Sequence, residues 1–327
     1  MVPFVDPLTG VPLENRGDAL WAPGMSEPAA HVVDGIPRFV ARDENYAESF
    51  GWQWKHWANT LSDRRNASSA KREEVLQRTR FLDYDLQGKT ILECGMGGGD
   101  DTEVLLDLPF AEVHSFDLST AVERAVRYLD DPRLVISQAS ITAIPYPDEA
   151  FDFVFCHRVL QHTPDPVASL RSICRKVRPG GVLFAHVYKF GWRNLMHFKY
   201  KYRWLTRRLP SRWIAWYVER IGPTLHALNR FMWRRNVVLK GLGYNFVPFQ
   251  YHDAYGDMTD EQLLELAKLN TFDALTPRYD RPLTSRKFRT AIEAEGFRIE
   301  HYHDPSFSPL YCTAVKTRAS SALASAA

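Results

Sequence analysis

The sequence predicts an α/β protein built on a doubly wound parallel sheet, and three observations support this. Residues 88–188 alternate short apolar runs with helix-like segments, the pattern of repeated strand–helix–strand units. One apolar run, Thr90–Cys94, leads directly into a glycine-rich turn that opens a helix. The chain has 327 residues, of which 45% are hydrophobic and 24% charged. This composition allows a large core and excludes disordered, collagen-like and disulfide-scaffold proteins.

Two segments of different character precede the sheet. Residues 1–42 alternate Pro and Gly with short β-like runs and therefore predict a small β-rich extension. The β-like runs lie at Ala19–Trp21, His31–Val33 and Ile36–Val40. Residues 43–87 predict a helical segment, because Tyr46, Phe50, Trp54 and Trp57 recur at helical spacing.

The sheet domain is predicted to comprise residues 88–191 and 284–318, interrupted by an insertion at residues 192–283. In the second part, Thr284 or Ser285 is expected to cap a helix that Gly296 ends. Two strands are expected after this helix, at Phe297–His303 and Tyr311–Lys316.

The four cysteines show no paired spacing, so neither a zinc site nor a redox motif is expected, and a reducing compartment fits. No apolar stretch reaches the roughly 18 residues that span a bilayer, and no leader-like segment is found. We therefore expect an intracellular protein that does not span a membrane. Two locations stay open, the cytoplasm and the inner face of the membrane.

The formal net charge of +2 hides an uneven distribution. Residues 192–240 hold 12 Lys and Arg but a single acid, Glu219, which gives this segment a formal charge of +11. The remaining 29 bases and 38 acids give the rest of the chain −9. Five of the nine tryptophans lie in the same basic segment. The insertion is therefore a distinct basic and aromatic module within an acidic protein.

The turn Glu93–Gly99 carries the strongest indication of a ligand site. Its glycines let the backbone approach a ligand where a strand ends and a helix begins. A dinucleotide fingerprint needs a third glycine at position 100, where this chain has Asp100, an acid that disfavours a pyrophosphate. The spacing suits a ligand with an amino-acid head group. Glu93 can hold the ammonium group of such a ligand, and the glycine amides can line its carboxylate. A ligand-free tight turn is the alternative.

The next strand, Val113–Asp117, ends in an acid 24 positions after Glu93. An acid at this place accepts both hydroxyls of a ribose in doubly wound nucleotide folds. The alternative role of Asp117 is to cap the helix that follows.

Residues 88–188 resemble the class I S-adenosylmethionine-dependent methyltransferases, including those encoded with bacterial surface-glycan or natural-product pathways. Besides the glycine turn and Asp117, the similar motifs are Ile144–Asp152, Val159–Pro166 and Val177–Gly181. The resemblance implies a Rossmann-like, doubly wound, seven-stranded sheet whose last strand is antiparallel, and S-adenosylmethionine as the cofactor.

The resemblance also implies which residues contact the cofactor. Glu93 and Gly95 correspond to the methionine part and Asp117 to the ribose, while Ser140 stands where relatives often have an acid near the adenine. The full predicted set is Glu93, Gly95, Met96, Gly97, Asp117, Leu118, Ser140, Ile141 and His157.

Two histidines are candidate catalytic residues. The fourth strand should deliver His157 to the edge of the sheet where acceptors bind, and imidazole suits a general base that takes a proton from a hydroxyl. A histidine satisfied by neighbouring backbone is the alternative. His162 lies in the Gln-His-Thr-Pro turn, and for it a structural hydrogen-bonding role is favoured over catalysis.

Weaker resemblances concern the flanking segments. Residues 5–40 are similar to small zinc-ribbon-like extensions, but the metal-binding cysteines are missing, so a scaffold without metal is expected. Residues 46–57 and 270–280 resemble parts of glycan or natural-product methyltransferases. Together with the end of the fifth strand, they make Tyr46, Tyr188, Asp273 and Tyr279 substrate candidates, each open to a core or bracing role.

The basic module has several possible partners. Arg with Trp and Tyr is typical of an interfacial helix on anionic lipid, and residues 192–240 are predicted to allow such peripheral membrane contact. The same composition suits a phosphate-bearing acceptor or, less well, nucleic acid. In a plainer alternative, its arginines pair with the acidic sheet domain or with a second subunit in a homodimer.

The predicted function is methyl transfer to a hydroxyl, less readily to N or C, of a small-molecule or lipid-linked acceptor: a glycan, glycolipid or secondary metabolite. An RNA methyltransferase and a non-catalytic cofactor-binding protein are the alternatives.

Overall fold

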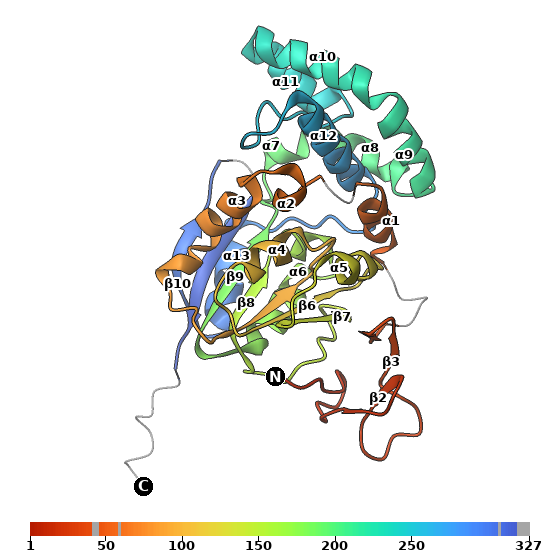
Figure 1. Ribbon diagram of the computed structural model, residues 1–327. Coiled ribbons are helices and arrows are strands. Elements are labelled where there is room, and N and C mark those ends of the chain that lie inside the picture. Colours follow the sequence, from red (N-terminus) through yellow and green to blue (C-terminus); the bar gives the residue numbers. More distant parts are fainter. Residues whose placement is uncertain (41–45, 58–59, 307–308, 319–327) are drawn as a thin grey trace.

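The computed structural model describes residues 1–40, 46–57, 60–306 and 309–318, and a twisted sheet lies at its centre (Figure 1). Seven of its strands follow the order β7-β6-β5-β8-β9-β11-β10. The neighbours from β7 to β9 pair in parallel, while β11 is antiparallel to both β9 and β10, as predicted for the last strand. These strands are β5 (Thr90–Cys94), β6 (Glu112–Asp117), β7 (Leu134–Gln138), β8 (Phe151–Cys156), β9 (Val177–Val187), β10 (Phe297–His303) and β11 (Leu310–Lys316).

The predicted count of seven strands is wrong for the sheet as a whole, which has eleven described strands. The additional four come from the N-terminal extension: β1 (Glu14–Asn15), β2 (Ala19–Trp21), β3 (Ala30–Val33) and β4 (Ile36–Arg38). They form an antiparallel meander whose last strand joins β7 in parallel through the pair Arg38 and Gln138. The Arg38 guanidinium also donates to the Gln138 side chain at 2.8 Å. The extension therefore continues the sheet instead of forming a separate body.

Helices cover both faces of the sheet because its strands are buried on both sides, as the fully buried β8 shows. Val75 of α3 (Ala70–Thr79), Val104 of α4 (Asp100–Leu106) and Val122 of α5 (Val122–Tyr128) belong to the core of one face. Helices α6 (Pro166–Lys176) and α13 (Ser285–Ala294) pack on the other face. Short 3-10 turns lie at Phe81–Asp83 (η1) and Leu160–His162 (η2).

Side-chain caps explain where two of these helices begin. The Asp165 carboxylate accepts from the backbone N–H groups of Val167 and Ala168, and Pro166 occupies the first turn of α6. Thr284 caps α13 by accepting from the N–H of Lys287, as the sequence predicted, and Gly296 follows the helix with a φ of +80°.

The predicted helical segment before the sheet contains α1 (Glu48–His56) and α2 (Asp63–Asn66) in addition to α3. Residues 43–45 of that prediction lie outside the described residues. Tyr46 precedes α1 and Trp57 follows it, so only the middle of the predicted aromatic stripe is helical.

The insertion folds into helices that gather at one end of the molecule, as the upper part of Figure 1 shows. They are α7 (Trp192–Leu195), α8 (Phe198–Thr206), α9 (Ser211–Arg220), α10 (Gly222–Arg235), α11 (Val237–Phe246) and α12 (Asp260–Leu275). We call residues 192–275 the cap. The cap has its own buried apolar cluster, which includes Phe198, Val218 and Phe272. Of the helices that the structure describes, none is both long and apolar enough to cross a membrane.

The chain enters the cap directly from the carboxyl end of β9. The parallel strands β5, β6, β7 and β8 end at the same edge of the sheet, so the cap lies over that edge. In open α/β sheets this is the edge where ligands bind.

Candidate active site

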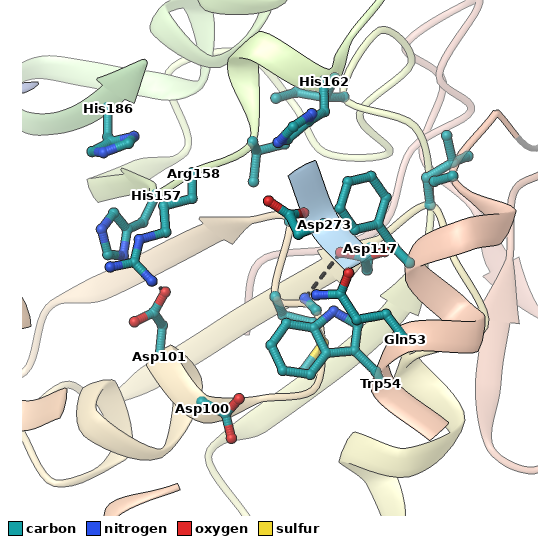
Figure 2. A pocket seen from close by; sticks show the side chains of 18 of the residues that line it. Gln53, Trp54, Asp100, Asp101, Asp117, His157, Arg158, His162, His186 and Asp273 are labelled. Carbon is teal, nitrogen blue, oxygen red and sulfur yellow. Dashed lines mark hydrogen bonds and ion pairs between the residues drawn. The ribbon is translucent and has the colours of Figure 1, made fainter. Parts of the chain in front are cut away.

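A cavity of about 370 Å³ lies at the carboxyl edge of the sheet, beneath the cap. Its lining residues come mainly from the ends of the central strands, from α1 and the two residues before it, and from α3, α4 and α12. Figure 2 shows how side chains from these elements converge. The size and the mixture of apolar and polar lining groups are typical of a small-molecule site.

The glycine-rich turn after β5 forms the floor of the cavity. Gly95, Gly97 and Gly99 have φ values of +87°, +52° and +92°, a region that side chains with a Cβ rarely adopt. A Cβ on Gly95 would lie 2.3 Å from a methyl carbon of Val159, and one on Gly97 would lie 2.9 Å from the indole nitrogen of Trp54. The turn therefore needs glycine both for its backbone path and for its packing.

Asp117 ends β6 beside this turn and lines the cavity, as the sequence placed it. Its Oδ2 accepts from the Gly97 N–H at 2.9 Å, and its Oδ1 accepts from the Ser119 N–H and hydroxyl at 2.8 and 2.6 Å. Burial raises the pKa of the Asp117 carboxyl, although these donors oppose the shift. Asp117 thus holds the glycine turn in position and presents a buried acceptor to the cavity.

The structure corrects the expectation that Glu93 contacts a ligand directly. Glu93 is fully buried and does not line the cavity. Its Oε2 accepts from the hydroxyls of Thr102 and Ser115 at 2.6 and 2.7 Å, which holds the side chain between β5, β6 and α4. Burial raises the pKa of the Glu93 carboxyl to about 8. Glu93 is therefore a bracing residue behind the glycine turn.

Only some of the remaining residues that were predicted to contact the cofactor line the cavity. Met96, Leu118 and Ile141 line the cavity, but Ser140 does not. The Ser140 hydroxyl instead makes a 2.7 Å hydrogen bond with the Thr142 hydroxyl. This corrects the placement of Ser140, which does not line the cavity, while its neighbours Ala139 and Ile141 do.

The environment of His157 does not favour its predicted role as general base. His157 lines the cavity but is buried, and both of its ring nitrogens have protein partners. Nδ1 lies 3.0 Å from Asp101 Oδ2, and Nε2 lies 3.0 Å from the Arg78 guanidinium. Because guanidinium only donates, Nε2 is the acceptor and Nδ1 carries the proton. Burial lowers the pKa of His157 to about 4, so the ring is neutral and its lone pair is occupied.

His162 has the arrangement that His157 lacks. Its Nδ1 lies 3.1 Å from the backbone carbonyl oxygen of Tyr279, which only accepts, so Nδ1 carries a proton. No described residue hydrogen bonds to Nε2. The ring packs edge-on against Phe50 and Tyr188 at 5.1 and 5.6 Å between centroids and lines the cavity. The predicted structural hydrogen bond exists, and it leaves the other nitrogen free.

Three of the four predicted substrate residues line the cavity. Tyr188, directly after β9, donates at 3.5 Å to Asp273 of α12, and both residues line the cavity. Tyr46 lines the opposite wall, and burial raises the pKa of its phenol to about 12. Tyr279 does not line the cavity but packs edge-on behind Tyr46 at 5.5 Å, so its side chain braces the wall.

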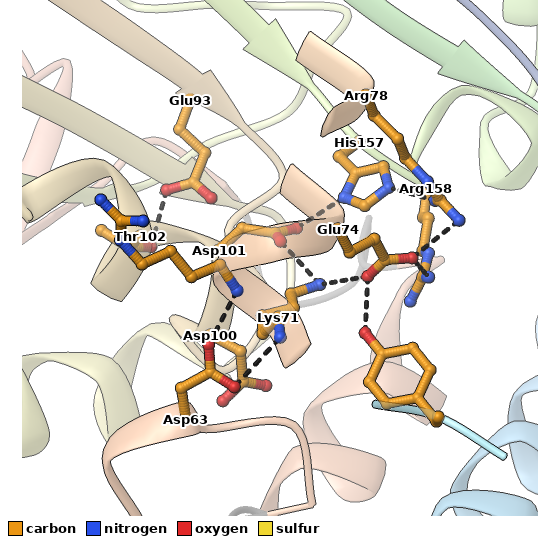
Figure 3. A network of polar contacts seen from close by, with 12 residues as sticks. Asp63, Lys71, Glu74, Arg78, Glu93, Asp100, Asp101, Thr102, His157 and Arg158 are labelled. Carbon is orange, nitrogen blue, oxygen red and sulfur yellow. Dashed lines mark hydrogen bonds and ion pairs between the residues drawn. The ribbon is translucent and has the colours of Figure 1, made fainter. Parts of the chain in front are cut away.

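A buried network of charged side chains, absent from the sequence predictions, closes another side of the cavity (Figure 3). Lys71 of α3 lies 2.6 Å from Asp101 and 3.6 Å from Glu74, and Glu74 also pairs with Arg78 and Arg158. Burial opposes ionisation of Glu74, but Arg158 and Lys71 outweigh it and lower the pKa of its carboxyl. Lys71, Arg78, Asp101 and Arg158 line the cavity. On α3, Lys71, Glu74 and Arg78 have the spacing of a charged face that is exposed to solvent. The sequence therefore did not indicate that they form part of a buried network at the cavity.

Several polar atoms at the cavity are buried and have no hydrogen-bond partner among the described residues. They are both carboxylate oxygens of Asp100, the amide oxygen of Gln53 and Nδ1 of His186. Burial raises the pKa of Asp100 to about 6 despite the nearby Arg124. Unpaired buried polar groups are costly in a finished core, so these atoms indicate a site that a ligand completes. The described residues contain no cluster of His, Cys, Asp and Glu that could hold a metal ion.

Comparison with known proteins connects this site to a family. Residues 92–185 match the family model described as a methyltransferase domain. The malonyl-[acyl-carrier protein] O-methyltransferase of Halorhodospira halophila is 39% identical over 103 residues, which cover 30% of this chain and 34% of that protein. A ubiquinone biosynthesis O-methyltransferase of Stutzerimonas stutzeri is 35% identical over 113 residues, 33% of this chain and 48% of that protein. The chain thus spans less than half the length of these curated relatives.

Solved structures give a looser likeness. The Haloferax volcanii methyltransferase solved in complex with the Trm112 activator is 15% identical, with a TM-score of 0.47 over 85% of this chain and 100% of that chain. An S-adenosylmethionine-dependent methyltransferase of Mesorhizobium loti is also 15% identical, with a TM-score of 0.44 over 75% of this chain and 97% of that chain. These low scores carry no functional information.

The matched residues run from β5 to β9 and include the glycine turn, Asp117 and both histidines. The part of the sheet around them has an antiparallel last strand, β11, as the resemblance implied. Residues 92–185 are therefore similar to a methyltransferase domain, and the sheet that contains them has the class I arrangement, for which S-adenosylmethionine is the cofactor.

Proposed function

We propose that the protein transfers a methyl group from S-adenosylmethionine to a hydroxyl of a small-molecule or lipid-linked acceptor. The observation that carries this proposal is a single cavity with the glycine turn and Asp117 at one end and the unpaired Nε2 side of His162 at the other. A donor site and a candidate proton acceptor therefore share one enclosed space.

The residues at the first end suit the cofactor. Asp117 suits the ribose hydroxyls, and the apolar side chains of Met96, Leu118 and Ile141 suit a flat purine. The Asp100 carboxylate and the Gln53 amide oxygen suit an ammonium group, because no described residue hydrogen bonds to these acceptors and Arg124 comes no closer than 3.9 Å to Asp100 Oδ1. When bound, S-adenosylmethionine supplies an electrophilic methyl group on a sulfonium.

The residues at the second end suit an acceptor hydroxyl. The Tyr279 carbonyl fixes the proton of His162 on Nδ1, so Nε2 is left to take a proton from the acceptor. Tyr188, Asn270 and Asp273 add donors and acceptors that orient a polyhydroxylated or phenolic molecule. Phe50 and Trp54 add aromatic side chains to the cavity wall. Positioning of this kind can supply roughly 7–11 kcal/mol of the barrier.

The proposed acceptor class is a glycan, a glycolipid or a secondary metabolite. The curated relatives are named O-methyltransferases, which supports oxygen as the methylated atom. The polar acceptor end supports a molecule that carries several hydroxyls. RNA is a second candidate acceptor because of the basic cap.

The test has two stages. Calorimetry with S-adenosylhomocysteine and, separately, with NAD is expected to show binding of the first alone, and binding of NAD alone would overturn the proposal. Radiolabelled S-adenosylmethionine is then incubated with fractionated extracts and the wild-type protein or its Asp117→Ala variant. Label that depends on Asp117 and enters a hydroxylated small molecule or glycolipid supports the proposal. Label in RNA would overturn the acceptor class, and cofactor binding without any labelled product would indicate a non-catalytic protein.

A further inference from the structure

The cap exposes an unusual amount of apolar surface. Of the 23 large apolar side chains that are exposed in the described part of the chain, 15 lie between residues 192 and 246. They include Trp192, Trp204, Trp213 and Trp216, each between 59% and 81% exposed. Soluble monomers rarely leave such groups together in water, so this surface calls for a partner.

The exposure does not reflect poor packing of the cap helices. In α9 the residues Ile214, Ala215 and Val218 are buried in the cap cluster, while Trp213 and Trp216 on the other side of the same helix are exposed. Helix α9 therefore has an inner face that packs within the protein and an outer face that does not.

Seven of these 15 exposed apolar side chains lie at two turns. The α8–α9 turn (residues 204–213) exposes Trp204, Leu205, Leu209 and Trp213. The α10–α11 turn (residues 231–240) exposes Phe231, Val237 and Val238, the last two at 81% and 67%.

Basic side chains flank both turns, and most have no acidic partner. Arg207, Arg208 and Arg212 belong to the α8–α9 turn, and Arg234, Arg235 and Lys240 belong to the α10–α11 turn. Of these six, only Arg234 lies within 4.0 Å of a described carboxylate, that of Asp253 at 3.9 Å. The predicted alternative, in which the cap arginines pair with the acidic sheet domain, therefore fails for these residues.

The exposed apolar side chains of the two turns, together with the basic side chains that have no acidic partner, distinguish between the possible partners of the cap. A second copy of the chain would bring two surfaces of the same strong positive charge together, which is unfavourable. Nucleic acid would use the charge and the aromatic rings, but it offers nothing to Leu205, Leu209, Val237 and Val238. An anionic bilayer satisfies both groups, because tryptophan and aliphatic side chains enter the interface while Arg and Lys meet the lipid phosphates.

We propose that the α8–α9 and α10–α11 turns of the cap dock on the surface of an anionic lipid bilayer. The protein then binds peripherally, with the turns in the headgroup region and the sheet domain on the aqueous side. The same docking brings the cavity close to the bilayer, because α12 contacts α8, α9 and α10 and also lines the acceptor end through Leu269, Asn270 and Asp273. In the frame of the proposed function, on which this last step rests, the acceptor is an amphiphile that reaches the cavity from the lipid surface.

Vesicle flotation tests the docking without any methyl transfer. We expect the protein to float with vesicles of equal parts phosphatidylglycerol and phosphatidylcholine and to stay behind with pure phosphatidylcholine. Increasing salt is expected to weaken the binding. In the Trp213→Ala/Trp216→Ala variant and in the Arg207→Glu/Arg212→Glu variant, we expect the vesicle partition coefficient to fall about tenfold or more. The Val237→Ser/Val238→Ser variant tests the second turn in the same way.

Matched controls lie away from the cap. Leu82→Ala removes an exposed apolar side chain (61%) from η1, and Arg286→Glu reverses an exposed charge on α13. Both are expected to float like the wild type, and all variants are expected to keep S-adenosylhomocysteine binding, which shows that they fold. Equal binding of all variants, or no binding to anionic vesicles, would overturn the docking. A stable dimer that the Trp213→Ala/Trp216→Ala variant abolishes would also overturn the docking. If docking holds but no lipid-borne acceptor is labelled, the proposed function is in error and the docking is not.

Discussion

The Nδ1 nitrogen of His162 lies 3.1 Å from the backbone carbonyl oxygen of Tyr279. This contact joins the turn after β8 to the segment after α12, and it fixes which ring nitrogen carries the proton. The opposite nitrogen is thereby left as an acceptor, and the ring that carries it lines the cavity.

We expect His162→Gln to lower kcat by about 10²–10⁴-fold with the acceptor identified by the labelling screen, because the variant lacks the general base. The affinity for S-adenosylhomocysteine should change little, since no predicted cofactor contact is lost. His157→Gln is the matched control, because His157 also lines the cavity but has both nitrogens occupied. A larger loss of kcat in the His157 variant than in the His162 variant would reverse the assignment of the base.

Asp117→Ala is expected to weaken S-adenosylhomocysteine binding by about 100-fold, the equivalent of about 2.7 kcal/mol. The change removes the cavity's ribose acceptor and also frees the Gly97 and Ser119 donors that hold the turn. Calorimetry measures the dissociation constant. Asp273→Asn, at the acceptor end of the same cavity, should leave that constant within about threefold of the wild type; an equal loss in both variants would argue against separate donor and acceptor ends.

Glu93 should make the stability of the protein depend on pH in a specific direction. Its folded pKa of about 8 lies above the ordinary value of 4.5, so between these pH values the unfolded carboxyl loses its proton while the folded one keeps it. Stability from this group is therefore present below pH 4.5 and is lost as pH rises to about 8. We expect the free energy of unfolding of Glu93→Gln, relative to the wild type, to increase across this window.

Urea denaturation at several pH values within that window measures the difference. The contribution of His157 has the opposite sign, because its folded pKa of about 4 lies below the ordinary 6.5 and stability is lost as pH falls between them. That contribution is common to wild type and variant and cancels in the comparison. A difference that stays constant with pH would show that Glu93 is ionised in the folded protein.

Glu74→Gln is expected to lower the free energy of unfolding by about 3–5 kcal/mol, the usual cost of removing one partner from a buried ion pair. The buried Lys71 and the partly buried Arg78 and Arg158 would remain near Asp101 with too little negative charge. The exposed pair Arg16 and Glu14 offers the control, and Glu14→Gln should change stability by less than about 1 kcal/mol. Similar losses in the two variants would show that the network is solvated in the protein.

The sequence predicted those parts of the fold that depend on local pattern. The alternation of residues 88–188 gave the parallel strands, the Thr284 cap and the last two strands were placed correctly, and Asp117 was expected beside the glycine turn. The joining of β4 to β7 was not predictable, because it depends on one pair, Arg38 and Gln138, from segments about a hundred residues apart.

The site was predicted less completely, for two physical reasons. Whether the side chains of Glu93 and Ser140 reach the cavity depends on the direction in which they point. The spacing of residues along the chain does not indicate this direction. Lys71 and Arg78 lie on one face of α3 at a spacing that normally indicates solvent, so only the tertiary structure shows that the face is buried. The sequence did offer one indication for His186, because it lies near the end of β9, the strand beside β8, which His157 follows. A single histidine in an apolar strand is, however, as typical of a core as of a functional site.

Helix α12 contributes both to the cap cluster and to the cavity wall. Phe272 packs inward among the cap residues while Asp273, its neighbour in sequence, faces the cavity. The choice of acceptor can consequently be altered by substitutions on one side of a single helix, without disturbing the loops that hold the methyl donor. Residues 269, 270 and 273 are thus the natural positions for a small combinatorial library aimed at new acceptors.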